Sequence, residues 1–380
     1  MFAVLLSLSL SMSAAASATR ADLGRALFFD ANLSAARTQS CATCHDPAAG
    51  FRDPRNNGVD GAASLGADGQ SLGDRNTPSI TYAAATPAFH RDPDGHYRGG
   101  QFHDGRSADL ARQAVEPIMN PLEMAQADPR AIVERVRENP GYVDAITALY
   151  GAAVWSSAAR VLAAIGECLA AFEQTAEFNP YDSKYDRYLR GAYTLTPLEE
   201  MGRSLFFSPL TNCSSCHLQN RSSLQEHETF TNYRYYNIGL PVNRTLRAQN
   251  GLGDAHRDPG LLANPAVHDA ALAGKFRVPS LRNVAVTAPY MHNGVFRELH
   301  TAIVFYNKYT VNSRQSRTNP ETGERWGETE FPQTVDTDLL SQGQPIDAGR
   351  AEALIAFLKT LTDARYEHLL EPGDEVPSNP

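Results

Sequence analysis

Apolar residues recur along this chain at intervals of three and four, which is the spacing of one face of an α-helix. Two such stripes are formed by Val161, Ile165, Leu169 and Phe172, and by Leu354, Phe357, Leu358 and Leu361. No run of alternating apolar and polar residues indicates a strand. Tracts rich in Gly, Asp and Asn (52–76 and 312–346) are too long to be simple connections between helices. The pattern predicts a mainly α-helical protein with long loops.

Capping residues mark where several of these helices begin. Asp128-Pro129 is typical of a helix start, and Gly151 is expected to end that helix. Thr196-Pro197-Leu198-Glu199 is a capping box with proline at the first helical position. Another helix is predicted to begin after Asp347. Cys168 lies on the first apolar stripe, which favours a buried and unreactive thiol.

A short motif occurs twice, as Cys41-Ala-Thr-Cys44-His45 and as Cys213-Ser-Ser-Cys216-His217. Two thiols at this spacing can attach to the vinyl groups of a haem, and the histidine that follows can bind the iron. A single Cys-x-x-Cys would also suit zinc or a thioredoxin-type redox pair. Because both copies are followed directly by histidine, the motifs predict two covalently bound haem c groups, with His45 and His217 as iron ligands.

The surroundings of the two motifs also repeat, which indicates an internal duplication. Residues 23–29 resemble residues 201–207, and Thr77-Pro78-Ser79 resembles Val278-Pro279-Ser280. His103-Asp104-Gly105 likewise resembles His292-Asn293-Gly294. We therefore expect two cytochrome c-like haem domains, at residues 19–190 and 191–370, followed by a polar tail at 371–380.

Composition narrows the partners and the compartment. The 34 Lys and Arg residues against 43 Asp and Glu give a formal charge of −9, and no basic block suggests nucleic-acid binding. Residues 2–15 are apolar and rich in Ser and Ala, and Ala16-Ser17-Ala18 fits a cleavage site, so residues 1–18 are predicted to be a signal peptide. The usual positively charged start is missing from it. The apolar run is too short to span a bilayer, so no membrane span is expected after cleavage. Covalent haem attachment happens outside the bacterial cytoplasm, which favours the periplasm.

The two halves differ at one position that matters for iron. Tyr306 stands fourteen residues after His292, whereas Pro117 stands fourteen residues after His103. If the two helices superpose, the second iron receives a phenolic ligand and the first receives none. A haem with an open side can react with peroxide, while a six-coordinate haem handles electrons. A packed aromatic residue on a core helix is the alternative for Tyr306.

Two polar residues are predicted near the open side of the first haem. Glu123 could move a proton between the two oxygens of a peroxide, and Gln113 could donate a hydrogen bond there. Each of them could instead be an ordinary residue at a helix end.

Taken together, these stretches resemble the MauG-like di-haem enzymes of the bacterial di-haem cytochrome c peroxidase family. The resemblance runs from about Leu23 to Leu370. It is carried by residues 40–47, 73–78, 120–124, 283–287, 289–294 and 305–310. It implies that Tyr306 binds the second iron and that Glu123, Gln113 and Pro117 line the distal pocket of the first. It also implies one calcium ion, held by Asn76 and the backbone carbonyls of Thr287 and Pro289, since oxygen ligands suit that cation.

The chain departs from this resemblance at two positions. His103 stands where MauG-like enzymes have a tryptophan between the haems, and Thr211 stands where they have a surface tryptophan. Neither side chain is readily oxidised to a radical, so long-range transfer to a protein substrate is in question. We expect His103 to lie between the haems and to couple them by packing and hydrogen bonding.

These observations predict a di-haem oxidoreductase that reacts with hydrogen peroxide, and the resemblance implies that it oxidises a tryptophan on a periplasmic partner protein. The resemblance suggests an amine dehydrogenase precursor or a copper-binding protein as that partner. One alternative is a cytochrome c peroxidase that takes electrons from a small cytochrome c or a cupredoxin. Another is a di-haem electron carrier without chemistry of its own.

Overall fold

A computed structural model of the chain describes residues 18–55, 57–219 and 224–370. The helices of the first half are α1 Arg20–Phe28, α2 Cys41–Cys44, α3 Leu110–Gln113, α4 Glu116–Met119, α5 Pro129–Arg137, α6 Pro140–Tyr150 and α7 Ala158–Glu173. Those of the second half are α8 Lys184–Leu189, α9 Pro197–Phe206, α10 Arg244–Gln249, α11 Leu299–Val304, α12 Asn307–Thr310, α13 Thr337–Leu340 and α14 Ala348–Lys359. Helix is thus the main regular structure, as predicted.

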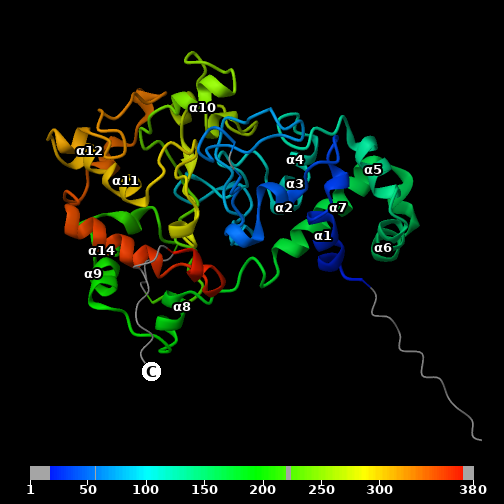
Figure 1. Cartoon of the computed structure of the whole chain (residues 1–380), viewed down its shortest axis with the longest axis horizontal. Helices are drawn as coiled ribbons and strands as arrows, with labels where there is room; N and C mark the ends of the chain where they lie inside the picture. Colours follow the sequence, from blue (N-terminus) through cyan, green and yellow to red (C-terminus); the bar gives the residue numbers. More distant parts are fainter. Residues whose placement is uncertain (1–17, 56, 220–223, 371–380) are drawn as a thin grey trace, which may run out of the picture.

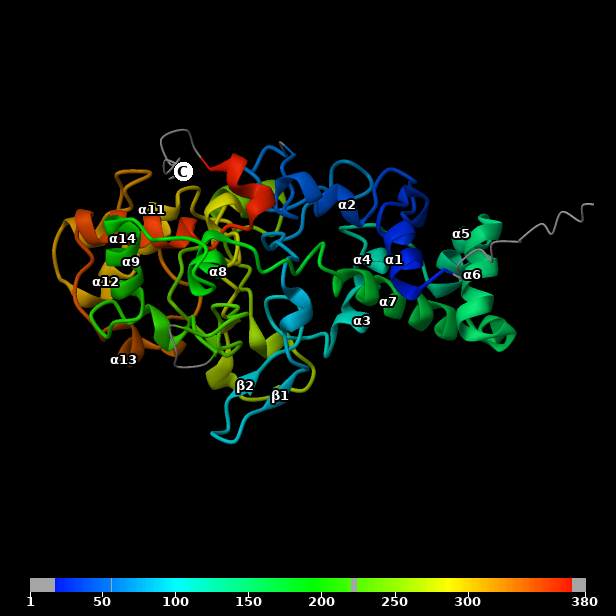
Figure 2. The same cartoon turned by 90° about the horizontal axis from the view of Figure 1, so that it is seen from below.

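The two sets of helices lie at opposite ends of an elongated molecule, and long loops fill the space between them (Figures 1 and 2). Helices α1, α5, α6 and α7 form one end, and α9, α11, α12 and α14 form the other. The amphipathic stripes explain this arrangement, because each set buries its own apolar faces.

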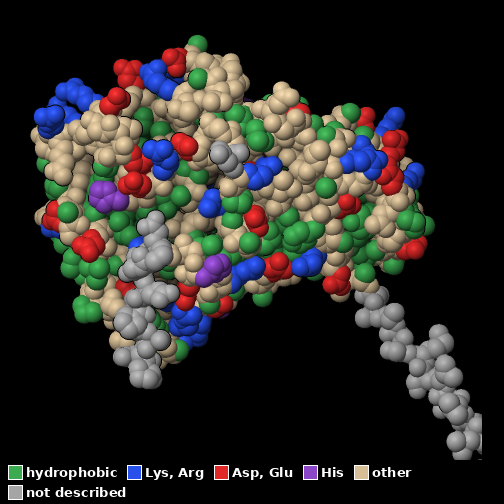
Figure 3. Space-filling view, viewed as in Figure 1, with side chains coloured by type: hydrophobic (Ala, Val, Ile, Leu, Met, Phe, Trp, Pro, Cys, Tyr) green, Lys and Arg blue, Asp and Glu red, His purple; other side chains and the backbone are tan. Residues whose placement is uncertain are grey.

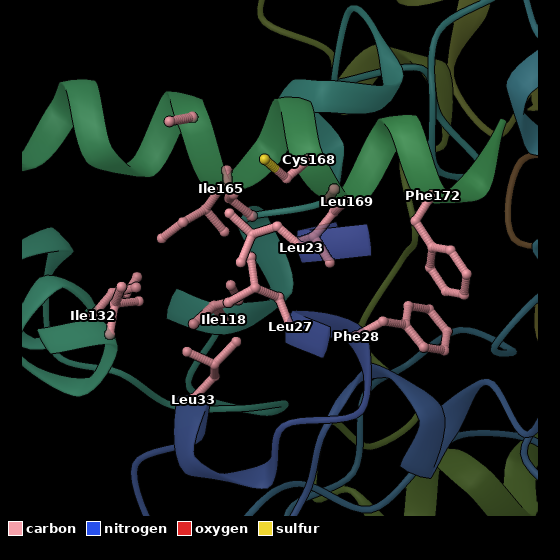
Figure 4. Packing of buried hydrophobic residues seen from close by; sticks show 14 of the residues in the cluster. Leu23, Leu27, Phe28, Leu33, Ile118, Ile132, Ile165, Cys168, Leu169 and Phe172 are labelled. Atoms are coloured by element: carbon pink, nitrogen blue, oxygen red, sulfur yellow. The ribbon is translucent and has the colours of Figure 1, made fainter. Parts of the chain in front are cut away.

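The core of the first half is built where α1 crosses α7. Leu23, Leu27 and Phe28 of α1 pack against Ile165, Cys168, Leu169 and Phe172 of α7 (Figure 4). The two backbones touch at Gly24, since a Cβ atom there would lie 1.9 Å from the carbonyl oxygen of Cys168. Only glycine permits this approach. Cys168 is fully buried, as its place on the apolar stripe predicted.

The core of the second half is built in the same way where α9 crosses α14. Phe206 packs with Leu354, Phe357 and Leu358. A Cβ atom on Gly202 would lie 1.8 Å from the carbonyl oxygen of Ala353, so these backbones also touch. Each crossing therefore uses one glycine on its first helix.

Two very short antiparallel ladders lie among the loops, although the pattern predicted no strands. Strand β1 His90–Arg91 pairs with β2 Tyr97–Arg98, and β3 Tyr235–Tyr236 pairs with β4 Phe276–Arg277. Two residues per strand are too few for an alternating pattern to be visible in the sequence.

The predicted helix ends are confirmed with one correction. Helices α9 and α14 begin at the expected caps, Thr196 and Asp347, and Gly151 ends α6. The single helix expected from Asp128 to Gly151 is wrong, because it is two helices, α5 and α6. The break comes where Asn139 caps α6 and Pro140 starts it, since proline cannot continue a helix from the preceding turn.

Buried polar contacts join the halves. Asn283 of the second half donates to the hydroxyl of Thr81 at 3.3 Å, and the hydroxyl of Tyr82 donates to the carboxylate of Asp363 at 2.5 Å. Asn283 also donates to the carboxylate of Asp363, at 2.8 Å. The final segment, residues 364–369, then returns to the first half and places Tyr366 in its core. Helix α8 packs Tyr185 into the second core, although it precedes the predicted boundary at Gly191.

Basic and acidic side chains are interspersed on the face shown in Figure 3. Among the described residues no helix has the length and hydropathy needed to cross a membrane. The predicted signal peptide (1–18, apart from residue 18) and the polar tail (371–380) lie outside the described residues.

Candidate active site

The first Cys-x-x-Cys-His motif forms a single helical turn, α2, which places its histidine against a backbone carbonyl. The N–H of His45 donates to the carbonyl of Cys41 at 2.9 Å, which closes the turn. The Nδ1 atom of the ring lies 3.1 Å from the carbonyl oxygen of Phe51. Burial lowers the pKa of His45. The ring is therefore neutral, and with its Nδ1–H donating to the carbonyl, Nε2 is left free to bind a metal.

The second motif has the same arrangement. The N–H of His217 donates to the carbonyl of Cys213 at 3.0 Å, and its Nδ1 lies 3.2 Å from the carbonyl oxygen of Phe230. Burial lowers the pKa of His217 to about 4. Phe51 and Phe230 both adopt left-handed backbone angles, with φ of 58° and 55°. In both halves a strained turn thus aims a carbonyl at the histidine.

The thiols of both motifs lie beside these histidines in a partly buried setting. Burial raises the pKa of Cys41 to about 12 and that of Cys216 to about 11. Both groups are thiols rather than thiolates at neutral pH.

The predicted distal residues of the first half are brought together by one tight turn after α4. The N–H of Met124 donates to the carbonyl of Pro117 at 3.1 Å, and the N–H of Glu123 donates to that of Asn120 at 3.0 Å. This turn places Glu123 beside Pro117, and Gln113 approaches from the end of α3. Burial raises the pKa of Glu123.

Arg106 is a charged neighbour of Glu123 that the sequence did not single out. Its charge opposes the effect of burial on the pKa of Glu123. The guanidinium lies over the ring of Phe102 at 3.7 Å and pairs with Asp104 at 3.0 Å. Arg106 lies in the repeated segment around His103, but nothing in its spacing marked it as part of the pocket.

His103 lines the cavity and contacts the backbone of Asn76. Its Nε2 atom is 2.9 Å from the carbonyl oxygen of Asn76, and the N–H of Asn76 donates to the carbonyl of His292 at 2.7 Å. Burial lowers the pKa of His103 to about 4, so the ring is neutral and donates to Asn76. The ring of His292 stacks on Phe276, with centroids 3.5 Å apart. The two histidines that align in the sequence therefore meet at Asn76.

A buried arginine fixes the loops around this contact. Arg75 donates to both carboxylate oxygens of Asp258 at 2.7 Å and to Asp104 at 2.6 Å. Although burial opposes it, the charges of Arg75 and Arg106 lower the pKa of Asp104. Arg75 belongs to the stretch that carries the family resemblance, yet its role as a clamp depends on acids 29 and 183 residues away.

Tyr306 lies in the cavity at the start of α12, close to the cysteines of the second motif. Burial raises the pKa of Tyr306, and the neighbouring Cys216 and Cys213 act in the same direction. The side chain is therefore a phenol in these surroundings, and a positive ion would be needed to favour the phenolate. Pro117, the residue in the corresponding place of the first half, offers no such group.

The structure places the three predicted calcium ligands on one cavity. Asn76, Thr287 and Pro289 line the same cavity, although the backbone of Asn76 is also engaged by His103 and His292. Within the described ranges, no group of three or more His, Cys, Asp or Glu side chains is arranged to hold a metal. A cation here would depend on amide and carbonyl oxygens.

All of these predicted residues line one continuous cavity that runs from the first motif to the second. They are Cys41, Cys44, His45, Asn76, His103, Gln113, Pro117, Glu123, Cys213, Cys216, His217, Thr287, Pro289 and Tyr306. Thr211 lines it as well. So does Glu173, which the sequence could have flagged, since it is a carboxyl four residues after Leu169 on a buried helical face.

Comparisons with known proteins point to one family. The family described as di-haem cytochrome c peroxidase matches residues 18–194. The methylamine utilization protein MauG of Paracoccus denitrificans (strain Pd 1222) is 54% identical over 351 residues, which cover 92% of this chain and 90% of the relative.

Solved structures agree. The diheme peroxidase BthA from Burkholderia thailandensis E264 matches with a TM-score of 0.83 and 32% identity, over 94% of this chain and 89% of that one. A MauG-like protein associated with microbial copper homeostasis matches with a TM-score of 0.65 and 26% identity, over 98% and 100% of the two chains.

The residues of this chain fit the two haem groups that the family carries. Each motif offers a neutral histidine whose Nδ1 is held by a carbonyl, and each lies on the same cavity. The family predicted from the sequence is thereby confirmed. This chain belongs to the di-haem cytochrome c peroxidase family and is a peroxide-dependent di-haem oxidoreductase.

Proposed function

We propose that this enzyme uses hydrogen peroxide to oxidise a tryptophan on a partner protein in the periplasm. The observation that carries the proposal is the asymmetry of the cavity. Tyr306 lies beside the second pair of cysteines, whereas in the first half a tight turn brings the half-buried Glu123 beside Pro117. The end of the cavity at Tyr306 thus offers an oxygen ligand for a metal, whereas the end at Pro117 offers none and leaves room for a small reactant.

The four cysteines of the two motifs would bind the haem groups covalently, and Nε2 of His45 and of His217 would each bind an iron. The phenol oxygen of Tyr306 would be a further ligand of the second iron. When bound, haem supplies the electrons that peroxide needs and stores the resulting oxidising equivalents.

Glu123 would act as a general acid–base group, transferring a proton between the two oxygens of peroxide. Peroxide takes up two electrons and two protons and leaves as two molecules of water. A carboxyl can accept a proton from one peroxide oxygen and return it to the other. The buried setting that raises the pKa of Glu123 suits this exchange, and the amide of Gln113 would orient the peroxide. Pro117 keeps the pocket free of competing ligands.

His103 would couple the two ends of the cavity through a fixed contact. Its hydrogen bond to the carbonyl of Asn76, and the bond from Asn76 to His292, join the loops of both halves. A calcium ion held by Asn76 and the carbonyls of Thr287 and Pro289 would stiffen the same contact.

The partner is proposed by chemistry. The relative from Paracoccus is named for methylamine utilization, which favours an amine dehydrogenase precursor. The solved MauG-like protein is associated with copper homeostasis, which favours a copper-binding protein. A second candidate function is that of a cytochrome c peroxidase, which only reduces peroxide, with electrons from a small cytochrome c or a cupredoxin. The absence of an indole at positions 103 and 211, where His103 and Thr211 stand, supports this alternative.

The domain organisation is part of the same proposal. The glycine contacts at Gly24 and Gly202, and the carbonyls of Phe51 and Phe230, support an internal duplication. Residues 19–190 and 191–370 would be the two haem domains. Residues 1–18 would be a signal peptide for export to the periplasm.

The test is to incubate the haem-loaded enzyme and peroxide with each candidate protein, in separate reactions. Peptide mass spectrometry should find an oxidised tryptophan in an amine dehydrogenase precursor or in a copper-binding protein. Reduced cytochrome c serves as the competing substrate. Rapid oxidation of cytochrome c, with no tryptophan modified in either protein, would favour the peroxidase instead.

A further inference from the structure

Glu173 is a buried carboxyl that the reaction described above does not use. It is the last residue of α7 and is 5% exposed. Its Oε2 atom is buried and has no hydrogen-bond partner among the described residues. The side chain lines the cavity beside the first motif, where it acts on the thiol of Cys41. An unpaired carboxyl in such a place lowers stability, because burying a charge or an unsatisfied polar group is costly.

The second half shows that the fold does not require this carboxyl. A Cβ atom added to Gly24 would lie 3.0 Å from the Cβ of Phe172 on α7, and one added to Gly202 would lie 2.9 Å from the Cβ of Phe357 on α14. The two phenylalanines therefore occupy matching places. The residue after Phe172 is Glu173, and the residue after Phe357 is Leu358. Leu358 lines the cavity as Glu173 does. Leucine fills the position in one half, so glutamate in the other is a chemical difference rather than a packing need.

The charged groups around Glu173 do not neutralise it. Arg25 on α1 pairs with Glu177 at 3.8 Å, at the surface. Cys41 on α2 is a thiol, and Cys168 on α7 contacts the hydroxyl of Tyr150 at 3.4 Å. Burial alone raises the pKa of Glu173 to about 8. The carboxyl therefore holds its proton at neutral pH, yet can lose it when a nearby positive charge increases.

We propose that Glu173 is a positioning residue whose carboxyl exchanges a proton with solvent as the first haem changes oxidation state. When the iron gains one electron, the carboxylate takes up one proton. When the iron loses that electron, the carboxyl releases the proton. The summed charge of the first iron and the Glu173 carboxyl is thereby kept constant. In the second half, Leu358 stands at the matching position and has no proton to exchange. This inference rests on the proposed function only where that places the first haem at Cys41, Cys44 and His45.

The experiment is a redox titration of the haem-loaded enzyme, followed optically from pH 6 to pH 9. The first haem is identified as the one retained when Cys213 and Cys216 are replaced by Ala. Its midpoint potential should fall as the pH rises, by up to about 59 mV for each tenfold fall in proton concentration.

Two substitutions decide the role of the side chain. Glu173→Gln keeps the shape without the titrating proton, and Glu173→Leu copies the second half. Both should flatten the pH dependence of the first haem. Glu177→Gln removes another carboxyl four residues away and should leave it unchanged. Haem content and the far-ultraviolet circular dichroism show that each variant is folded.

The outcomes separate this inference from the proposed function. The inference about Glu173 is overturned if the potential of the first haem still depends on pH in Glu173→Gln. It is also overturned if that potential does not depend on pH in the wild type, or if Glu177→Gln abolishes the pH dependence. In each of these cases two haems are bound and the proposed function stands. Failure to bind two haems would overturn the proposed function instead.

Discussion

The two halves of this molecule share a framework and differ in what they present to the cavity. In both, a glycine lets two helices touch, and a carbonyl in a left-handed turn holds the histidine of the motif. The differences lie at the cavity wall. Pro117 in the first half corresponds to Tyr306 in the second, and Glu173 corresponds to Leu358. A repeated framework can thus carry two different chemistries, because few side chains decide what each end can bind.

The largest effect that would test this comparison is loss of one haem at a time. Replacing Cys213 and Cys216 by Ala should remove the second haem and leave the first, and replacing Cys41 and Cys44 should do the reverse. The mass of the denatured protein counts the haems that remain attached. If either pair of substitutions removed both haems, the two ends would not be independent binding sites.

Glu123→Gln should slow the reaction with peroxide by about 10²–10⁴-fold, since that is the usual contribution of a general acid–base group. Stopped-flow absorbance measures the rate. Glu116→Gln is the matched control, because that carboxylate lies 4.0 Å from the same arginine, Arg106, but its side chain is 40% exposed. An equal loss in both variants would mean that the charge around Arg106 matters, rather than the proton on Glu123.

Tyr306→Phe should convert the second haem from low spin to high spin and leave the first unchanged, because only the phenol oxygen is removed. Electron paramagnetic resonance distinguishes the two spin states. Tyr309→Phe is the control, since that hydroxyl donates to the carbonyl of Ile238 at 2.8 Å. An unaltered spectrum in Tyr306→Phe would identify Tyr306 as a packing residue.

Gly24→Ala and Gly202→Ala should each lower the free energy of unfolding by about 1–3 kcal/mol, as overpacking does. Thermal unfolding followed by circular dichroism measures both. Gly349→Ala on α14 meets nothing closer than 3.7 Å and should be neutral or slightly stabilising. If one of the first two were tolerated, the two helix crossings would not be equivalent.

His103→Trp should have the smallest effect. An indole at this position should leave the reaction with peroxide unchanged or faster, because it fills the same gap between the halves. Rates from stopped-flow absorbance, compared with those of His103→Ala, measure this. A reaction that is slower than in the wild type in both His103→Trp and His103→Ala would show that the hydrogen bond to Asn76 is essential.

Much of this site could be predicted because its residues are close in sequence to a motif or a repeat. The two Cys-x-x-Cys-His segments, the capped helices α9 and α14, and the place of Tyr306 in the cavity all follow from local spacing. The clamp of Arg75 on Asp104 and Asp258 could not, because it depends on loops that are distant in the sequence. The break before Pro140 was missed because the proline suits both the end of one helix and the start of another.

The return of the last segment to the first half has a consequence for how the protein is made. Tyr366 completes the core around α1 and α7, and Asn283 bonds Asp363 across 80 residues. Because synthesis starts at the amino terminus, the core of the first half would therefore stay incomplete until nearly the whole chain has been synthesised. Contacts between such distant residues also slow folding. Attachment of cofactor at Cys41 and Cys44 can thus begin on a half that is still open, well before the carboxyl end closes it.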